Sequence, residues 1–367
     1  MSHIVYIPKV FNHDSNSPIP KVSFENNTVK IGSRKSLLAV RQSEIVSKTI
    51  TKLYPELSTT ITKVSTLGDQ VQNRPLYSFG GKALWTKELE ILLLENVGEF
   101  EKIDLIAHSL KDMPTVLPDE FELGCIINRE DPRDALVMKA NSKYKTLADL
   151  PPGSIVGTSS VRRSAQIHRN YPHLIFKSVR GNIHTRLNKL DDPNSVFECI
   201  ILAAAGLIRC NLGDRITKYL DCDEMYHAVG QGAIGVEIKK NNETMRLLCS
   251  VIGCRETTWK CIAERSLLRT LEGGCSVPVG VWTTLNNDIL QLKAIVLSVD
   301  GSESVEDVLE KKITCDKDAF DLGIELADKL IAKGAKKILD KINFNKIQEI
   351  KNAGLTASET ATPEPGL

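Results

Sequence analysis

Four short segments of the sequence combine glycine, hydroxyl-bearing and cationic residues directly after an apolar stretch. They are residues 32–36 (GSRKS), 108–112 (HSLKD), 157–163 (GTSSVRR) and 180–186 (RGNIHTR). Each is typical of a junction between a strand and a helix, where open α/β sheets bind their ligands. Backbone N–H groups at a helix start attract anions, hydroxyl groups add donors, and arginine binds a carboxylate with two parallel hydrogen bonds. The pattern predicts a ligand with several carboxylates or phosphates.

Taken singly, each junction has a simpler explanation, because serine and threonine commonly cap helices. Their recurrence favours the binding interpretation, since four cationic helix starts oppose the helix dipole and require a compensating negative charge. Arg209 follows another predicted strand and adds a further cation. The candidate anion-binding arginines are Arg34, Arg162, Arg163, Arg180, Arg186 and Arg209.

Cys275 follows two glycines and precedes Ser276, Val277 and Pro278. The glycines end a strongly amphipathic helix and leave the cysteine accessible on a loop. A functional thiol and a small buried hydrophobic residue both remain open on these residues alone. A Cys–His hydrolytic pair is unsupported, because no histidine lies nearby in the sequence.

Asp112 lies on a turn, because Pro114 disfavours helix just ahead of it. One interpretation is an aspartate that hydrogen-bonds its own backbone. The other is a carboxylate kept ionised by neighbouring cations, which stabilises a developing positive charge or moves a proton.

The composition excludes several classes of protein. The 47 basic and 46 acidic side chains give a net charge of +1, whereas a general nucleic-acid binder carries a basic excess. The longest apolar run, residues 199–208, is shorter than the roughly 20 residues that cross a membrane, and we expect it to be a strand ending in a small-residue turn at 203–206.

Nine cysteines without a CxxC pair suggest neither disulfides nor a metal site. The first thirty residues resemble no export or mitochondrial signal, so we expect a cytoplasmic protein.

Short apolar strands alternate with amphipathic helices along the chain, which predicts an α/β fold. Strands are expected near 28–31, 60–65, 104–107, 154–157, 174–179, 199–203 and 232–238. Helices are expected at 36–53, 87–95, from about 160, and through 190. The polar stretch 67–82 is long for a loop inside a domain and is expected to form a lid.

Two crossings between lobes predict a hinged, two-lobed body. The expected divisions are a first domain of residues 25–128 and 232–250, a second of 132–228 and a smaller α+β third of 255–350. The third would contain helices at 257–271 and 319–333 and strands at 277–283 and 290–298, and would carry Cys275. Residues 1–24 and 352–367 have the composition of an added arm and a disordered tail.

Eight motifs, in one order, resemble the porphobilinogen deaminase family, also called hydroxymethylbilane synthases. They are GSRKSLLAVRQ, GGKALWTKELE, AHSLKDMPT, REDPRDA, GTSSVRR, VRGNIHTRL, YHAVGQGAIGVE and LEGGCSVPVG, and the match runs from about residue 30 to 340. The resemblance implies two type II periplasmic-binding-protein lobes with a hinged cleft and a third domain. It also implies a monomeric transferase of heme and porphyrin biosynthesis.

The reaction that the resemblance implies is the head-to-tail joining of four porphobilinogen molecules with release of ammonia, followed by hydrolytic release of hydroxymethylbilane. A dipyrromethane cofactor would be attached by a thioether to Cys275, and Asp112 would assist loss of the aminomethyl nitrogen and stabilise positive charge on the pyrrole nitrogens. The six arginines would bind acetate and propionate groups. Further contacts would come from Ser36, Lys82, Ser109, Lys111, Thr158, Ser159, Ser160, Asn182 and Gln231.

Two other classes of function remain as alternatives. A non-catalytic anion-binding protein on a two-lobed fold would explain the arginine junctions, but neither Cys275 nor a third domain. A thiol-dependent hydrolase lacks a suitable histidine and aspartate set.

Overall fold

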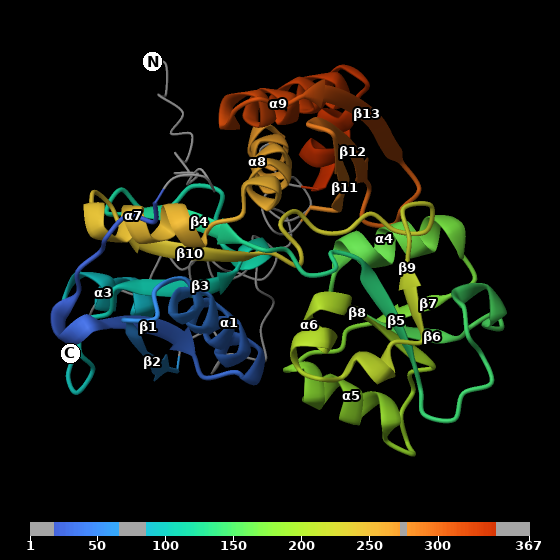
Figure 1. The fold of residues 1–367 in the computed structure, drawn as a ribbon. Coiled ribbons are helices and arrows are strands. Elements are labelled where there is room, and N and C mark those ends of the chain that lie inside the picture. The colour runs from blue at the N-terminus through green and yellow to red at the C-terminus, as the bar shows by residue number, and fades with distance from the viewer. Residues whose placement is uncertain (1–17, 66–85, 272–276, 343–367) are drawn as a thin grey trace, which may run out of the picture.

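The computed structural model describes residues 18–65, 86–271 and 277–342, and its first lobe contains a five-stranded mixed sheet (Figure 1). The strand order is β2-β1-β3-β10-β4, with bounds β1 Thr28–Arg34, β2 Ser58–Val64, β3 Leu105–Ser109, β4 Phe121–Ile127 and β10 Ile234–Lys239. β1, β2 and β3 run parallel, whereas β10 is antiparallel to β3 and β4. Because parallel strands share a carboxyl edge, Arg34 and Ser109 end on the same side of this sheet.

The second lobe repeats this pattern in a sheet of order β7-β6-β8-β5-β9. Its strands are β5 Asp134–Met138, β6 Ile155–Gly157, β7 Ile175–Lys177, β8 Cys199–Ala203 and β9 Lys218–Leu220. β6, β7 and β8 are parallel, and β5 is antiparallel to β8 and β9. In each sheet the antiparallel strand, β10 or β5, arrives from the other lobe. This order is that of type II periplasmic-binding-protein lobes, and the predicted fold class is confirmed.

The chain passes between the lobes twice, and the two crossings lie against each other. The first runs from β4 to β5 and the second from β9 to β10. The backbone N–H of Glu130 in the first crossing donates to the carbonyl of Gly232 in the second, at 3.1 Å. The side chain of Arg129 donates to the carbonyl of Gln231, at 2.8 Å. The expected return of residues 232–238 to the first sheet is therefore confirmed.

Helices cover both sheets, and α1, α4 and α5 begin at polar junctions that the sequence singled out. In the first lobe they are α1 Leu37–Leu53, α3 Lys87–Leu94 and α7 Glu243–Ile252, and in the second α4 Val161–Asn170, α5 Ile183–Asp191 and α6 Ala204–Arg209. Ser36, Ser160 and Asn182 accept hydrogen bonds from backbone N–H groups at the starts of α1, α4 and α5. Capping serines and asparagines of this kind fix where each helix begins.

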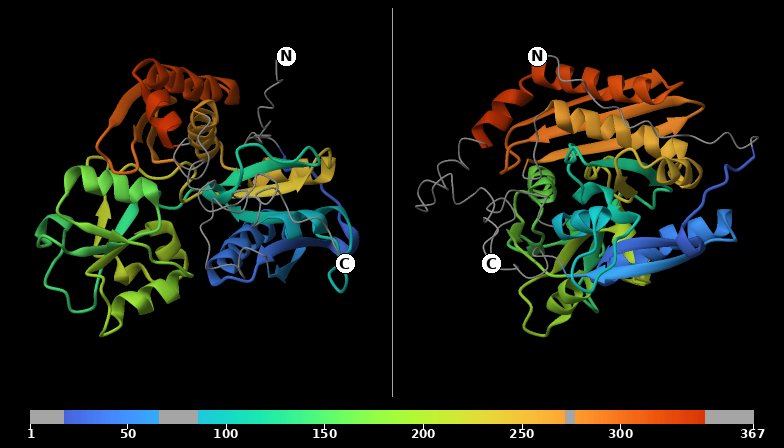
Figure 2. Two further views of the ribbon diagram at one scale, coloured as in Figure 1. Left: turned by 180° about the vertical axis from the view of Figure 1, so that it is seen from behind. Right: turned by 90° about the vertical axis from the view of Figure 1, so that its left-hand side faces the viewer.

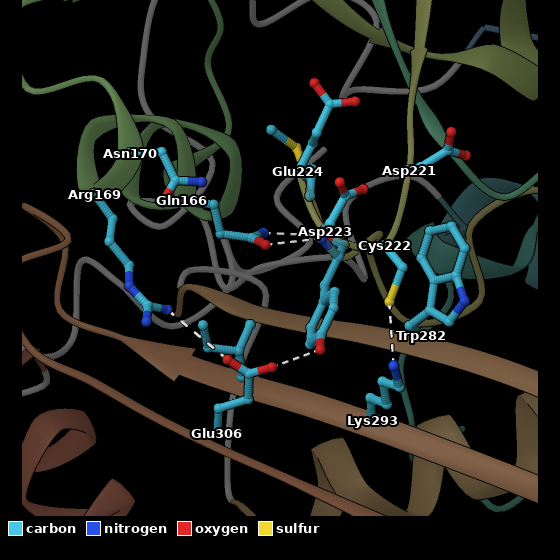
Figure 3. A pocket seen from close by; sticks show the side chains of 13 residues that line it. Gln166, Arg169, Asn170, Asp221, Cys222, Asp223, Glu224, Trp282, Lys293 and Glu306 are labelled. Atoms are coloured by element: carbon cyan, nitrogen blue, oxygen red, sulfur yellow. Dashed lines mark hydrogen bonds and ion pairs between the residues drawn. The ribbon is translucent and has the colours of Figure 1, made fainter.

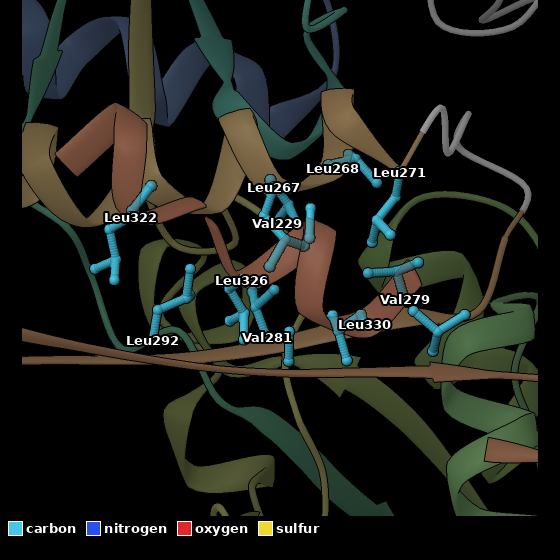
Figure 4. Close-up of a cluster of buried hydrophobic side chains, with 14 of the residues drawn as sticks. Val229, Leu267, Leu268, Leu271, Val279, Val281, Leu292, Leu322, Leu326 and Leu330 are labelled. Atoms are coloured by element: carbon cyan, nitrogen blue, oxygen red, sulfur yellow. The ribbon is translucent and has the colours of Figure 1, made fainter. Parts of the chain in front are cut away.

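The third domain is a three-stranded antiparallel sheet packed against two long helices. The sheet has the order β11-β12-β13, with bounds β11 Val279–Asn286, β12 Ile289–Leu297 and β13 Ser304–Lys312, and the helices are α8 Arg255–Thr270 and α9 Asp316–Ala332. Leu267 of α8 and Leu326 of α9 pack with Val281 and Leu292 in one hydrophobic core (Figure 4). The domain lies above the junction of the two lobes in the views of Figures 1 and 2.

Some local expectations were wrong. Residues 203–206 form no turn, because β8 runs directly into helix α6 at Ala204. Residues 18–24, which we expected to lie in a low-order arm, pack on the first lobe: Val22 and Phe24 contact its core, and the hydroxyl of Tyr54 donates to the carbonyl of Pro20 at 3.1 Å. The strands β4, β5, β9 and β13 and the helix α7 were not predicted. Within the described residues, no helix is long and apolar enough to cross a membrane.

Candidate functional site

Asp112 ends a single turn of 3-10 helix, Leu110–Asp112, that follows β3 directly. Two backbone hydrogen bonds hold this turn: Leu110 N–H donates to the carbonyl of Ala233 at 3.0 Å, and Met113 N–H donates to that of Leu110 at 3.2 Å. Leu110 is buried and Asp112 is exposed. The buried leucine therefore anchors the turn and presents the carboxylate outward, beyond the carboxyl end of the strand.

Lys111 lies beside this carboxylate, close to residues of the second lobe. Its ammonium donates to the side-chain oxygen of Gln231, at 3.4 Å. Its pKa is lowered to about 8: burial is the main cause, Asp112 and Asp134 oppose the shift, and Arg163 and Arg162 add to it. The ammonium thus lies among charges from both lobes.

Arg162 and Arg163 lie in the first turn of α4, and both are buried. Arg162 binds the carboxylate of Asp134 through Nη1, at 2.7 Å, and Arg163 binds it through Nη2, also at 2.7 Å. Burial raises the pKa of Asp134, but the two guanidinium charges outweigh it and hold that pKa well below its usual range. At this junction an internal aspartate supplies a negative charge to the two arginines, and a ligand anion here stays a prediction.

Arg186 extends from α5 toward the same place. Its Nε donates to the carbonyl of Gly181, at 2.7 Å. Burial lowers the pKa of Arg186 to about 10, Arg163 and Arg180 lower it as well, and Asp112 raises it. Since Asp112 lies in the first lobe and Arg186 in the second, the carboxylate and the guanidinium interact between the lobes.

Several predicted polar residues hold the junctions themselves together. Ser109 Oγ accepts from Gln42 Nε2 at 2.7 Å, which ties β3 to α1. Ser159 donates to the carbonyl of Val179 at 2.9 Å, and Thr158 Oγ1 accepts from the backbone N–H of Ser160 at 3.2 Å. Turn formation and contacts between elements therefore account for part of the hydrogen bonding of these residues. This agrees with the simpler interpretation, in which the polar residues of each junction serve the fold. Ligand contacts from the same hydroxyl groups stay a prediction.

Arg209, in the last turn of α6, links the second lobe to the crossing. Its Nη2 donates to the carbonyl of Gly232 at 2.7 Å, and its buried Nε has no hydrogen-bond partner among the described residues. Burial lowers its pKa to about 10, and the charge of Glu130 opposes the shift. A buried N–H donor without a partner suits an anionic ligand, because an unsatisfied polar group is costly.

Cys275, Lys82 and the expected lid at 67–82 lie outside the described residues. Arg34 and Arg180 are half-buried at the ends of their junctions. Of the predicted site residues, the structure places five close enough for their charges to interact: Asp112, Lys111, Arg162, Arg163 and Arg186.

Sequence reasoning missed Asp134, which pairs with two predicted site residues. It is fully buried as the first residue of β5. Its one signal was a charged residue directly before the apolar stretch ALVM, within the motif REDPRDA. A buried carboxylate is almost always paired, so this position pointed to a partner without identifying it.

A cavity of about 530 Å³ lies elsewhere, between the second lobe and the sheet of the third domain (Figure 3). Tyr226 donates to Glu306 across it at 2.5 Å, and the ammonium of Lys293 lies 3.7 Å from the sulfur of Cys222. None of the predicted site residues lines this cavity. Among the described residues, no group of three or more His, Cys, Asp or Glu side chains could hold a metal ion.

Comparison with known proteins places these features in a family context. Residues 29–247 match the family model described as "Porphobilinogen deaminase, dipyromethane cofactor binding domain", and residues 258–332 match "Porphobilinogen deaminase, C-terminal domain". A Debaryomyces hansenii protein named porphobilinogen deaminase is 58% identical over 355 residues, which cover 96% of this chain and 97% of that protein. Proteins of the same name from Candida albicans and Saccharomyces cerevisiae are 62% and 56% identical, each over 88% of this chain and 95% and 99% of their own. Among solved structures, a methionine-binding protein, MetQ, is 13% identical with a TM-score of 0.38, over 65% of this chain and 96% of its own.

Proposed function

The chain belongs to the porphobilinogen deaminase family, and on that premise we propose how its own residues carry out the reaction. The protein is a transferase of porphyrin and heme biosynthesis that acts on porphobilinogen with a dipyrromethane cofactor. It joins four porphobilinogen molecules head to tail with release of ammonia, and releases hydroxymethylbilane by hydrolysis. The dipyrromethane, when bound, supplies the pyrrole end to which the first substrate is joined.

The residues of the site suit such a cofactor and substrate, whose rings bear carboxylates. Arg209 has a buried donor without a partner among the described residues, and burial lowers the pKa values of Lys111 and Arg186. An added carboxylate would satisfy that donor and offset the desolvation of the two cations. Arg34, Arg180 and Lys82 are proposed to bind further carboxylates, and Cys275 to form the thioether.

Asp112 is the proposed catalytic residue, and its position among cations of both lobes is the observation that supports it. When ammonia leaves porphobilinogen, the carbon–nitrogen bond breaks and its electron pair departs with the nitrogen, which takes a proton. The positive charge left behind spreads onto the pyrrole nitrogen. A fixed carboxylate stabilises this charge, while Lys111, Arg163 and Arg186 bind the carboxylates of the ring.

Replacing Asp112 by Asn tests this role, because it keeps the shape and removes the charge. We expect kcat to fall by about 10² to 10³-fold, the range seen when one group that stabilises transition-state charge is lost. Intact mass should still show the cofactor adduct. Asp119→Asn, an exposed aspartate seven residues away, is the matched control and should retain activity. Near-normal turnover in D112N would remove Asp112 from the mechanism.

The attachment site has a separate test. A Cys275→Ser variant should have the mass of the bare polypeptide, because a serine hydroxyl does not form the thioether, whereas the wild type should carry two pyrrole units. Wild-type activity in this variant would contradict the assignment.

We further propose a monomer in the cytoplasm that requires neither nucleic acid nor a membrane. The eight cysteines within the described ranges are all free, even Cys125 and Cys249, which interact with each other in one core. Free thiols of this kind are typical of a reducing compartment. Cell fractionation tests the cytoplasmic location, and light scattering of the purified protein tests whether it is a monomer.

A further inference from the structure

Asp134 is fully buried at the start of β5, yet several donors from distant parts of the chain converge on its carboxylate. Oδ2 accepts from Arg162 Nη1 at 2.7 Å. Oδ1 accepts from Arg163 Nε at 2.9 Å and from Gln231 Nε2 at 3.0 Å. The arginines belong to α4 and the glutamine to the second crossing between the lobes, so one carboxylate joins three elements.

The two guanidinium groups are held on their other sides as well. Arg162 Nη1 also donates to the carbonyl of Tyr226 at 2.6 Å, and Arg163 Nη1 donates to that of Ile201 at 2.9 Å. One carboxylate against two guanidinium groups leaves a surplus of one positive charge. Asp134 therefore fixes the direction of both arginines without cancelling the charge that a ligand carboxylate would meet.

The contacts continue from Asp134 to the turn that carries Asp112. Gln231 Nε2 donates to the carbonyl of Pro132 at 2.7 Å as well as to Asp134, which orients its amide. The amide oxygen then accepts from the ammonium of Lys111 at 3.4 Å. A continuous set of polar contacts thus runs from the arginines of the second lobe to Lys111 of the first.

We propose that Asp134 is a positioning residue for the reaction: it fixes the guanidinium groups of Arg162 and Arg163 and, through Gln231, the ammonium of Lys111 beside Asp112. This inference rests on the proposed function, in which these cations hold substrate carboxylates and Asp112 acts on the pyrrole. Its consequence is that one buried carboxylate aligns the cations of both lobes, so the ring is held in register with Asp112.

The proposal has an electrostatic consequence that packing alone would not produce. The charged groups that act on Lys111 are Asp112 on its own turn, Asp134 on β5, and Arg162 and Arg163 on α4. Burial lowers the pKa of Lys111 most, the two aspartates raise it and the two arginines lower it, which gives a value of about 8. Removing the charge of Asp134 lowers the pKa of Lys111 further, so an activity that needs the ammonium is lost at a lower pH.

The test compares Asp134→Asn and Asp134→Glu with the wild-type holoenzyme. In D134N we expect kcat/KM to fall by about 10²-fold, the cost of misplaced binding groups, and the alkaline limb of its pH profile to move to lower pH. In D134E the charge remains but lies one methylene further along, so kcat/KM should fall by about tenfold while the alkaline limb stays in place.

Glu122→Gln is the matched control. Glu122 is also buried and binds an arginine in a bidentate manner, Arg246, at 2.7 and 2.8 Å, but it lies on β4 outside the site. It should lower the thermal unfolding temperature, as D134N does, and leave kcat/KM and the alkaline limb unchanged. If D134N does not fold, the result for D134E alone tests the proposal.

A wild-type kcat/KM in a folded D134E or D134N overturns the proposal. The proposal is also overturned if E122Q moves the alkaline limb of the pH profile as far as D134N does. D112N, measured in parallel, separates this result from a failure of the proposed function. An active D112N contradicts the proposed mechanism itself, whereas an inactive D112N beside a fully active D134N contradicts only the role of Asp134.

Discussion

At the scale of single residues, the site depends on cationic side chains whose charged form is destabilised by burial. Lys111 and Arg186 both have pKa values lowered by burial, to about 8 and about 10. Asp112 opposes both shifts, which means that its carboxylate interacts favourably with each cation. A ligand carboxylate placed between them would act in the same direction, so binding and ionisation are coupled.

Replacing Lys111 by Arg tests this coupling through pH. The lysine loses its proton as the pH rises through about 8, whereas a guanidinium keeps its charge across the accessible range. If the cation is what activity requires, the alkaline limb of kcat/KM should move up by at least about one pH unit in K111R. Lys239→Arg, an exposed lysine at the end of β10, should leave the limb in place. An unchanged limb in K111R would assign the alkaline titration to another group.

At the scale of elements, the two crossings between the lobes form one packed unit. Gly232 in the second crossing accepts from Glu130 N–H and from Arg209, so three segments meet at one peptide. Its φ is +84°, and a Cβ built there would lie 2.3 Å from the carbonyl oxygen of Glu130. Only glycine fits this close approach without moving the first crossing.

A Gly232→Ala variant should therefore be less stable, by about 1–3 kcal/mol, because the new methyl group meets backbone rather than a flexible side chain. We also expect lower activity, since Gln231 and the first crossing must shift together. Gly213→Ala is the control, because a Cβ there meets nothing within 4 Å. Urea unfolding measures both variants, and equal midpoints would show that the crossing tolerates the displacement.

At the scale of the whole molecule, a buried ionic cluster attaches the third domain to the junction of the lobes. Arg129 donates to both carboxylate oxygens of Glu264 in α8, at 2.6 and 3.0 Å, and Gly230 N–H donates to the same carboxylate at 2.8 Å. His227 lies beside them with its ring 5.6 Å from that of Trp282, and its Nε2 is buried without a partner among the described residues. The domain expected to carry Cys275 is thus held where the crossings meet.

His227 should make this arrangement sensitive to acid. Burial and then the charge of Arg129 lower its pKa from 6.5 to about 4. Between these values the unfolded chain binds a proton that the folded protein does not, so stability is full above pH 6.5 and falls as the pH drops toward 4. The loss amounts to about 3 kcal/mol at most. His227→Asn should reduce this acid dependence of urea unfolding, while His173→Asn, at an exposed position, should not. Identical acid slopes in H227N and the wild type would rule out His227 as the cause.

The sequence by itself determined the alternation of strands and helices, the junctions where helices start and the family. Hydrophobic periodicity and capping residues act within a few positions, so α1, α4 and β8 could be predicted to within a few residues. β4 was missed because all its residues are buried, so its sequence shows no alternation. β13 was missed because its charged residues are not typical of a strand, although it is a half-buried edge strand.

Only the tertiary structure decided how the cations of the site are arranged. Asp134 lies 28 residues from Arg162 and 97 from Gln231 in the chain, and nothing in their local sequence specifies that they share a carboxylate. The interaction of Asp112 with Arg186 likewise exists because two sheets of the same topology present their carboxyl ends to each other. Local sequence sets which charges a segment carries, whereas their partners depend on how distant elements pack, because a buried charge is stable only where the fold supplies its counter-charge.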